Sequence, residues 1–304
     1  MIIILISLGL QVNAQEQQEV LIIGTMHDVP KVVKHSYKPL LRKARRYNPD
    51  AIYVERQRPE DTLSLANYES RWFLPKGDTL RQTFVEDCRR IERLKATSVK
   101  AMSTDDFAYL RDYYMVNRDK ANWYYYAYLA KYGLKGSKQP LRNENSDLTS
   151  RLAIHQDMNF IYAMDHQHET QTYTRLWNDC VAESKKDREV EVLRKLNKKS
   201  YNKAIIPAAF GGLSRYTNRV KTIEMYQLIN RATFRKTDCE PCLAAGAVWD
   251  RRNAGMAANI GSQMLEYGHQ KAVVIVGAGH VLGIRDELKK QFPALKVMIM
   301  EDLK

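Results

Sequence analysis

Two short apolar runs, at residues 20–23 and 272–276, constrain the fold of this chain most strongly. Both are rich in valine or isoleucine and lack an alternating polar face, which is typical of a parallel strand buried on both sides. The first run leads into the motif Gly-Thr-Met-His at 24–27, and the second into Gly-Ala-Gly-His at 277–280. The chain is therefore expected to contain a parallel sheet with a histidine just beyond two of its strands.

The rest of the chain supplies the helices and strands that such a sheet needs. Residues 37–47 form an amphipathic pattern, and the following apolar run at 51–54 ends at Glu55, which predicts a βαβ unit with parallel strands. Further strands are expected at 159–164 and 296–300. We predict one α/β domain spanning 15–304, with a largely parallel sheet of about five strands flanked by helices and a large helical insertion at about 59–156.

Polar residues follow several of these strands at the point where each strand ends. They are His27, Glu55, Asp165 with His166, and His280. The carboxyl ends of parallel strands lie at one edge of a sheet, and ligands bind at that edge. We therefore expect these side chains to form one site.

Glycines accompany both histidines. Gly24, Gly277 and Gly279 permit tight turns and a close approach of the backbone to a bound cofactor. A dinucleotide-binding loop is not expected, because the third glycine of Gly-x-Gly-x-x-Gly would fall at Leu282.

Two imidazoles with one or two carboxylates are the ligands that divalent ions of the Mn, Co or Zn class accept. Such an ion would activate water or polarise a carbonyl group. Without a metal, the same groups would suit histidine–glutamate acid–base chemistry. Arg252 or Asn253 is expected on the buried face of a helix, since Arg252 begins a stripe at i, i+4 spacing with Met256. A buried guanidinium or amide needs a partner, and the carboxylates of the site or a substrate oxyanion are candidates.

The terminus and the charge bear on location and partners. Residues 2–10 are apolar and precede a small-residue site at 12–14, which predicts a signal peptide at 1–14 and an exported protein, periplasmic or secreted. No later stretch predicts a transmembrane anchor. The net charge of +13 is spread over many segments without a nucleic-acid-binding motif, so nucleic acid is not expected as a partner. The oligomeric state stays open.

Four cysteines suit an oxidising compartment: Cys88, Cys180, Cys239 and Cys242. The Cys-x-x-Cys at 239–242 fits a disulfide, a redox pair or half of a zinc site. A local disulfide is favoured over chemistry, because no second pair lies at zinc-finger spacing. The pairing of the four cysteines stays open.

Together, the motif at 24–27, Glu55, the Arg252–Asn253 pair and the motif at 277–280 resemble the Tiki/TraB/GumN superfamily, in an exported bacterial-type branch. This group is similar to erythromycin esterases and to ChaN-like haem-uptake proteins. The resemblance implies an EreA/ChaN-like α/β fold with its cleft at the strand ends, and metal-dependent peptide hydrolysis for Tiki-type members. It also implies that His27 and His280 are metal ligands or bases, that Glu55 is a ligand or general base, and that Arg252 stabilises charge.

These observations lead to three alternatives. The first is a metal-dependent hydrolase of peptide, ester or lactone bonds, acting on a small-molecule or peptide substrate. The second is a haem- or metal-binding uptake protein without turnover, in which histidines and the tyrosine-rich helices hold the cofactor. The third is a binding module that uses its positive surface on anionic envelope polymers.

Overall fold

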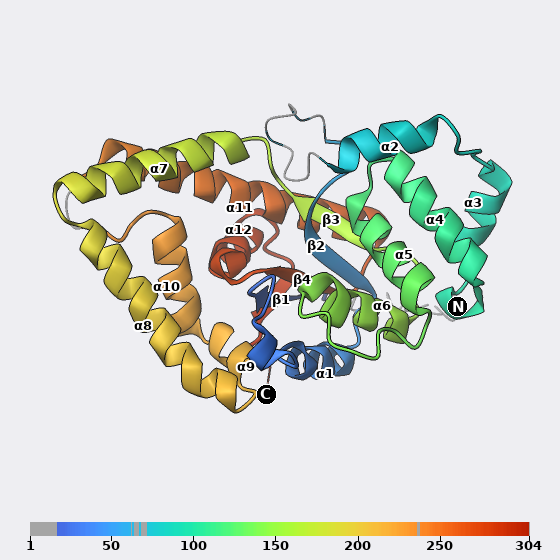
Figure 1. The fold of residues 1–304 in the computed structure, drawn as a ribbon, viewed down its shortest axis with the longest axis horizontal. Coiled ribbons are helices and arrows are strands. Elements are labelled where there is room, and N and C mark those ends of the chain that lie inside the picture. Colours follow the sequence, from blue (N-terminus) through green and yellow to red (C-terminus); the bar gives the residue numbers. More distant parts are fainter. Residues whose placement is uncertain (1–16, 62, 64–66, 68–71, 236–237, 304) are drawn as a thin grey trace, which may run out of the picture.

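The computed structural model describes residues 17–61, 63, 67, 72–235 and 238–303. The signal peptide predicted at 1–14 lies outside this part of the chain. Five parallel strands form one sheet in the order β3-β2-β4-β1-β5 (Figure 1). They are β1 (Glu19–Thr25), β2 (Ala51–Gln57), β3 (Tyr162–Asp165), β4 (Lys271–Gly277) and β5 (Lys296–Ile299). The predicted α/β fold with a parallel sheet is confirmed.

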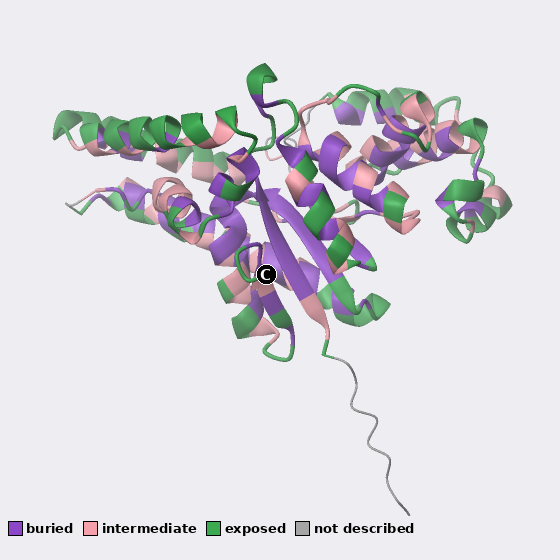
Figure 2. Ribbon diagram, turned by 90° about the horizontal axis from the view of Figure 1, so that it is seen from below, coloured by how far each residue is buried: buried purple, intermediate pink, exposed green. Residues whose placement is uncertain are grey.

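The two faces of the sheet bury separate sets of side chains. Leu21, Ile23 and Ile52 point towards α1 (Tyr37–Tyr47) and the helices of the insertion. Val20 and Tyr53 point the other way, towards the long helix α11 (Glu240–Tyr267) and α12 (Val281–Gln291). Because side chains alternate along a strand, the sequence of each strand decides which layer a residue meets. The sheet is accordingly buried along most of its length (Figure 2).

The insertion between β2 and β3 packs its helices beside the sheet, at the right of Figure 1. Stacked aromatic rings such as Tyr114 and Tyr126, with centroids 5.5 Å apart, form much of its core. Its elements are α2 (Phe73–Arg81), α3 (Cys88–Lys95), the 3-10 turn η3 (Val99–Ala101), α4 (Thr104–Val116), α5 (Lys120–Tyr132), the π-helical turn η4 (Asn145–Ser150) and α6 (Arg151–Gln156).

The sequence analysis predicted a helical insertion at about 59–156, but part of this segment is not helical. Residues 133–143 form an irregular connection that returns to the end of β1, where the amide of Glu144 donates to the carbonyl of His27 at 3.2 Å. Gly133 and Gly136 adopt φ of 61° and 69°, and Pro140 lacks a backbone donor, so helix α5 cannot continue through this segment. The chain therefore re-enters the edge where the strands end.

Between β3 and β4 the chain forms a second group of helices, at the left of Figure 1. Besides α11, this group contains α7 (Thr170–Lys186), α8 (Val190–Ala209), α9 (Leu213–Thr217) and α10 (Val220–Asn230). Helix α7 lies along α11. Two 3-10 turns lie outside both groups of helices: η1 (Lys31–Val33) precedes α1, and η5 (Ala278–His280) follows β4.

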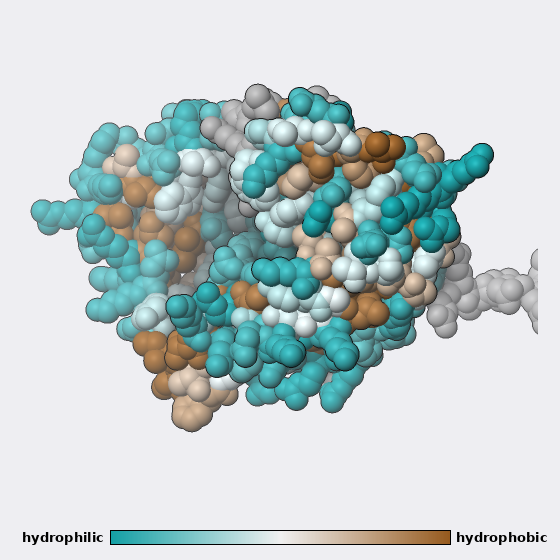
Figure 3. All heavy atoms as spheres, turned by 45° about the vertical axis from the view of Figure 1, so that its right-hand side comes forward, coloured by the Kyte–Doolittle hydropathy of each residue, from teal (hydrophilic) through white to brown (hydrophobic). Residues whose placement is uncertain are grey.

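The face of the molecule shown in Figure 3 is mainly hydrophilic, with apolar side chains in scattered patches. Within the described part of the chain, every helix is too short or too polar to cross a membrane.

Candidate functional site

The carboxyl ends of β1, β2 and β4 bring His27, Glu55 and His280 together. The Nε2 atom of His27 lies 3.8 Å from one carboxylate oxygen of Glu55, and the Nε2 atom of His280 lies 3.5 Å from the other. The two histidines are separated by most of the chain, yet both imidazoles face the same carboxylate. This arrangement follows from the parallel sheet, in which β4 lies between β2 and β1.

Glu55 occupies the face of β2 that meets α11. Ala51 and Tyr53 point to that layer, so alternation along the strand carries Glu55 to it as well. The buried carboxylate accepts hydrogen bonds from the Gly277 amide at 2.8 Å and from Arg252 Nη2 at 2.9 Å. Burial opposes its ionisation, but in the acid range where this carboxyl titrates the cationic forms of His280 and Arg252 together outweigh burial and hold the pKa of Glu55 below its ordinary value.

Arg252 also binds Asp165 through two parallel hydrogen bonds. Its Nε and Nη2 atoms donate to the two oxygens of Asp165 at 2.9 and 2.8 Å, and the Asp165 side chain is 1% exposed. Burial raises the pKa of Asp165, but the Arg252 guanidinium more than offsets this and lowers it to about 2. Asp165 is thus connected to Glu55 through Arg252. The sequence analysis had named the carboxylates of the site as candidate partners for this guanidinium.

His166 lies elsewhere. Its ring packs on His168 with centroids 4.4 Å apart, and a Cβ atom at Gly255 would come within 2.3 Å of it. No described contact joins His166 to Glu55 or to the other two histidines. The structure therefore groups Asp165 with the strand-end residues, and it does not group His166 with them.

His27 is held in place by a residue of the insertion. Its Nδ1 lies 2.8 Å from Glu144 Oε1, and its carbonyl accepts from the Tyr37 hydroxyl at 2.8 Å. The second oxygen of Glu144 accepts from the Thr25 hydroxyl. The hydrogen bond with Glu144 raises the pKa of His27 to about 9, although partial burial opposes this shift. Sequence analysis missed Glu144, which no motif marks within the expected helical insertion.

His280 is almost fully buried. Its Nδ1 lies 2.6 Å from Asn253 Oδ1, and its ring stacks on Trp249 with centroids 3.9 Å apart and an interplanar angle of 14°. Burial lowers the pKa of His280 to about 4, so its ring is neutral near pH 7. Trp249 was not identified from the sequence as a site residue, since an isolated tryptophan in a helix indicates only a buried position.

Gly277 lies directly beneath the site. A Cβ atom there would come within 2.8 Å of His27 Nε2 and 3.3 Å of Glu55 Oε2, so only glycine leaves room for both groups. The other two predicted glycines contact asparagine side chains. Asn218 bonds both the amide and the carbonyl of Gly24 at 2.8 Å, and Gly279 lies against Asn230.

Two imidazoles and a carboxylate are ligand types that divalent metal ions accept. Each imidazole turns Nδ1 towards an oxygen acceptor, Glu144 or Asn253, and turns Nε2 towards Glu55. This is the arrangement that fixes the tautomer of a metal-binding histidine. The lone pairs of the two Nε2 atoms and the ionised carboxylate repel each other unless a proton or a cation lies between them. The raised pKa of His27 favours that proton on His27 near pH 7.

A cavity of about 410 Å³ opens over these groups, a volume in the range of small-molecule sites. Arg252 and Trp249 contribute one wall, and the turn after β4 contributes another. Its lining residues are Thr25, Met26, His27, Glu55, Tyr226, Asn230, Trp249, Arg252, Gly277, Ala278, Gly279 and His280.

The sequence was also compared with known proteins. Neither the curated proteins nor the solved structures contain a significant match. The model of the TraB/PrgY/gumN family matches residues 10–291. This range includes both glycine–histidine motifs, Glu55, and Arg252 with Asn253, the residues on which the resemblance was based. The chain belongs to the TraB/PrgY/gumN family.

Proposed function

We propose that this protein is a metal-dependent hydrolase of peptide, ester or lactone bonds. One observation carries the proposal: the Nε2 atoms of His27 and His280 both face the buried carboxylate of Glu55, at 3.8 and 3.5 Å. A buried cluster of this kind needs a cation or a proton to be stable. Family membership agrees with the proposal without specifying an activity.

Each residue has a role that follows from its contacts. His27, His280 and Glu55 would hold the ion, while Glu144 and Asn253 orient the two imidazoles through Nδ1. A bound divalent ion would lower the pKa of a water molecule and polarise a substrate carbonyl. Arg252 keeps Glu55 ionised, which suits a ligand and opposes a role as general acid.

The cavity suggests how a substrate approaches. The side chain of His27 is 54% exposed and that of His280 is 4% exposed, so the open side of the site lies next to His27. Tyr226 and Asn230 of α10 face the same cavity and can contact the substrate beyond the scissile bond. A small-molecule or peptide substrate fits this space, and we place the reaction outside the cytoplasm, in the periplasm or in the secreted fraction.

Elemental analysis of the purified protein tests the metal site. We expect wild type to retain a stoichiometric Mn, Co or Zn ion, and His27→Ala and His280→Ala to lose it. His35→Ala is the matched control, because His35 is exposed and lies outside the cavity over the site. Full metal content in both site variants would contradict the proposal.

Turnover is tested with peptide, ester and lactone substrates, using protein loaded with each metal. We expect hydrolysis of at least one class, lost in Glu55→Gln and kept in His35→Ala. A Soret band on addition of haem, absent in His27→Ala and accompanied by no hydrolysis, would instead identify a haem-binding uptake protein.

A further inference from the structure

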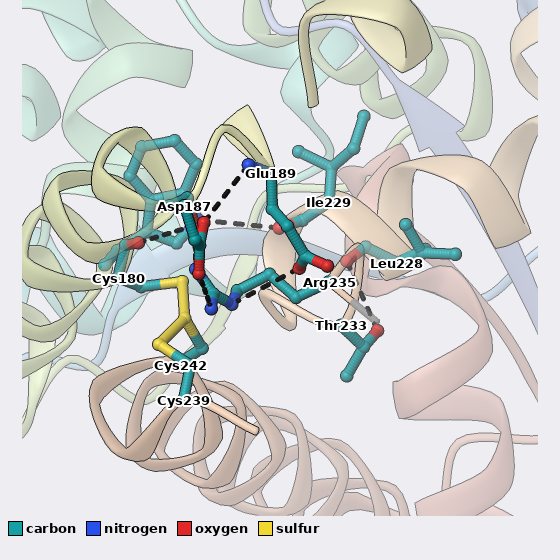
Figure 4. The surroundings of a disulfide bond; sticks show 11 residues. Cys180, Asp187, Glu189, Leu228, Ile229, Thr233, Arg235, Cys239 and Cys242 are labelled. Carbon is teal, nitrogen blue, oxygen red and sulfur yellow. Dashed lines mark hydrogen bonds and ion pairs between the residues drawn. A yellow bond between two sulfur atoms is a disulfide. The ribbon is translucent and has the colours of Figure 1, made fainter. Parts of the chain in front are cut away.

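Helix α11 begins at a cluster of three cysteines that lies outside the proposed hydrolytic site. Cys239 is the N-cap of this helix, Cys242 lies in its first turn, and Cys180 comes from α7. The three sulfur atoms lie within 4.8 Å of one another, and all three side chains are buried. Figure 4 shows Cys242 between the other two cysteines.

Cys242 is placed to pair with either neighbour. The structure places it at disulfide distance from both Cys180, with Cα atoms 4.6 Å apart, and Cys239, with Cα atoms 5.2 Å apart. Both separations fall within the range of about 4.4–6.8 Å that a disulfide requires. Since one sulfur forms only one disulfide, a chain with either bond keeps the third cysteine as a thiol. The local disulfide expected from the sequence is thus one of two pairings.

We propose that these three cysteines form a thiol–disulfide exchange site. The thiolate of Cys239 attacks the Cys242 sulfur of the Cys180–Cys242 disulfide, so that the Cys239–Cys242 bond forms and the Cys180–Cys242 bond breaks. Cys180 leaves as a thiolate and takes up the proton that Cys239 released. The reverse step restores the first pairing. The number of disulfides is unchanged, so the exchange needs neither an oxidant nor a reductant.

The surroundings support both the reactivity and the reach of these groups. Cys239 lies at the N-terminus of a 28-residue helix, where the helix dipole stabilises a thiolate. The C-terminal end of α7 is held independently of any disulfide, because Arg235 donates to the Ser184 hydroxyl at 3.0 Å and pairs with Asp187 (Figure 4). Cys180 therefore stays near Cys242 when its own bond is broken.

The pairing acts on the helix that carries Trp249. Helices α7 and α11 pack along each other, and Tyr173 of α7 contacts Trp249 with ring centroids 5.3 Å apart. Tyr173 lies seven residues before Cys180 on α7, and Trp249 lies seven residues after Cys242 on α11. Seven residues are two helical turns, or roughly 10 Å. The Cys180–Cys242 bond links the two helices near this contact, whereas the Cys239–Cys242 bond leaves them joined by noncovalent contacts, which include the ion pair of Arg251 with Glu169.

Alkylation of native Cys88→Ser protein tests the exchange, since that variant leaves only the three clustered cysteines. Cys239 is 8% exposed and Cys180 is fully buried, so iodoacetamide should react at Cys239. If the pairings interconvert, peptide mapping of protein quenched in acid before labelling finds both disulfides. As labelling proceeds, every chain ends with one label on Cys239 and the Cys180–Cys242 disulfide. A plateau at the starting fraction, or one fixed pairing at every time, would overturn the proposal.

Two further measurements complete the test. A zinc ion that protects all three thiols until a chelator is added would also overturn the proposal and identify a metal site. Amide hydrogen exchange compares Cys180→Ser, which allows only the local bond, with Cys239→Ser, which allows only the bond between helices. We expect faster amide hydrogen exchange in α7 of Cys180→Ser than in α7 of Cys239→Ser. Equal rates in the two variants would contradict the claim that the pairing acts on the contact between α7 and α11. None of these measurements depends on hydrolytic activity, so they test the exchange site separately from the proposed function.

Discussion

His280 and Asn253 are joined by a 2.6 Å contact between the imidazole Nδ1 and the amide Oδ1. Because Asn253 is 1% exposed, its orientation is set by packing, and it in turn sets which nitrogen of His280 faces Glu55. Gly283 allows this close approach, since a Cβ atom there would lie 2.3 Å from the Asn253 amide nitrogen.

We predict that Asn253→Ala weakens metal binding by about 10- to 100-fold, the usual effect of removing the partner that orients a histidine ligand. Competition with a chelator of known affinity measures this change. Asn259→Ala is the control, because Asn259 lies on the same helix and bonds Arg58 and the Met164 carbonyl instead. Equal affinity in Asn253→Ala and wild type would argue against His280 as a ligand.

Glu144→Gln should lower the pKa of His27 in the metal-free protein from about 9 towards the ordinary value of about 6.5. A histidine whose pKa is raised by folding adds stability that is complete below the unfolded pKa and is lost as the pH rises through the folded one. The free energy of unfolding of wild type should therefore fall between about pH 6.5 and 9, and this part of the fall should shrink in Glu144→Gln. NMR titration of the His27 ring and denaturation at several pH values measure both effects.

Arg252→Met should lower the free energy of unfolding by about 3–5 kcal/mol at pH 7, because it leaves the buried carboxylates of Glu55 and Asp165 without their counter-charge. The lowered pKa of Asp165 contributes stability above its unfolded pKa of about 3.9, which is lost as the pH falls towards 2. The difference between variant and wild type should therefore shrink in acid. Arg251→Met is the control: its ion pair with Glu169 is exposed, so its effect should stay below about 1 kcal/mol.

Gly277→Ala should displace His27 and reduce metal content while leaving the protein folded. The φ of Gly277 is −54°, which alanine adopts freely, so the effect is steric and arises from contact with His27 Nε2 and Glu55. Gly212→Ala is the control, because a Cβ atom there has its nearest neighbour at 3.4 Å. Circular dichroism and elemental analysis report fold and metal separately, and full metal retention in Gly277→Ala would count against the placement of His27.

The features that sequence predicted well are those encoded locally. Buried parallel strands are continuous apolar runs, so residues 20–23 and 272–276 identify β1 and β4 to within a few residues. A polar residue that ends such a run must lie at the carboxyl edge, which is why His27 and Glu55 could be grouped without coordinates. The choice between Arg252 and Asn253 was not decided by helical phase, and both side chains in fact reach the site.

The features that sequence missed depend on contacts between distant segments. Glu144 reaches His27 only because the chain leaves α5 at Gly133 and returns over β1, a path that no local pattern specifies. Trp249 covers His280 through the packing of α11 on the turn after β4. The neighbour of Cys242 on α7 likewise depends on how two helices pack, so the Cys-x-x-Cys spacing indicated only the local partner.

The position of β4 between β2 and β1 has a consequence for biosynthesis. The first two strands leave the ribosome long before the strand that separates them, and until it arrives each presents an unpaired, apolar edge. Closing the sheet must therefore wait for the last part of the chain, as expected of slow-folding proteins with distant strand partners. Chains interrupted before Lys271 should be substrates for chaperones and proteases rather than stably folded proteins.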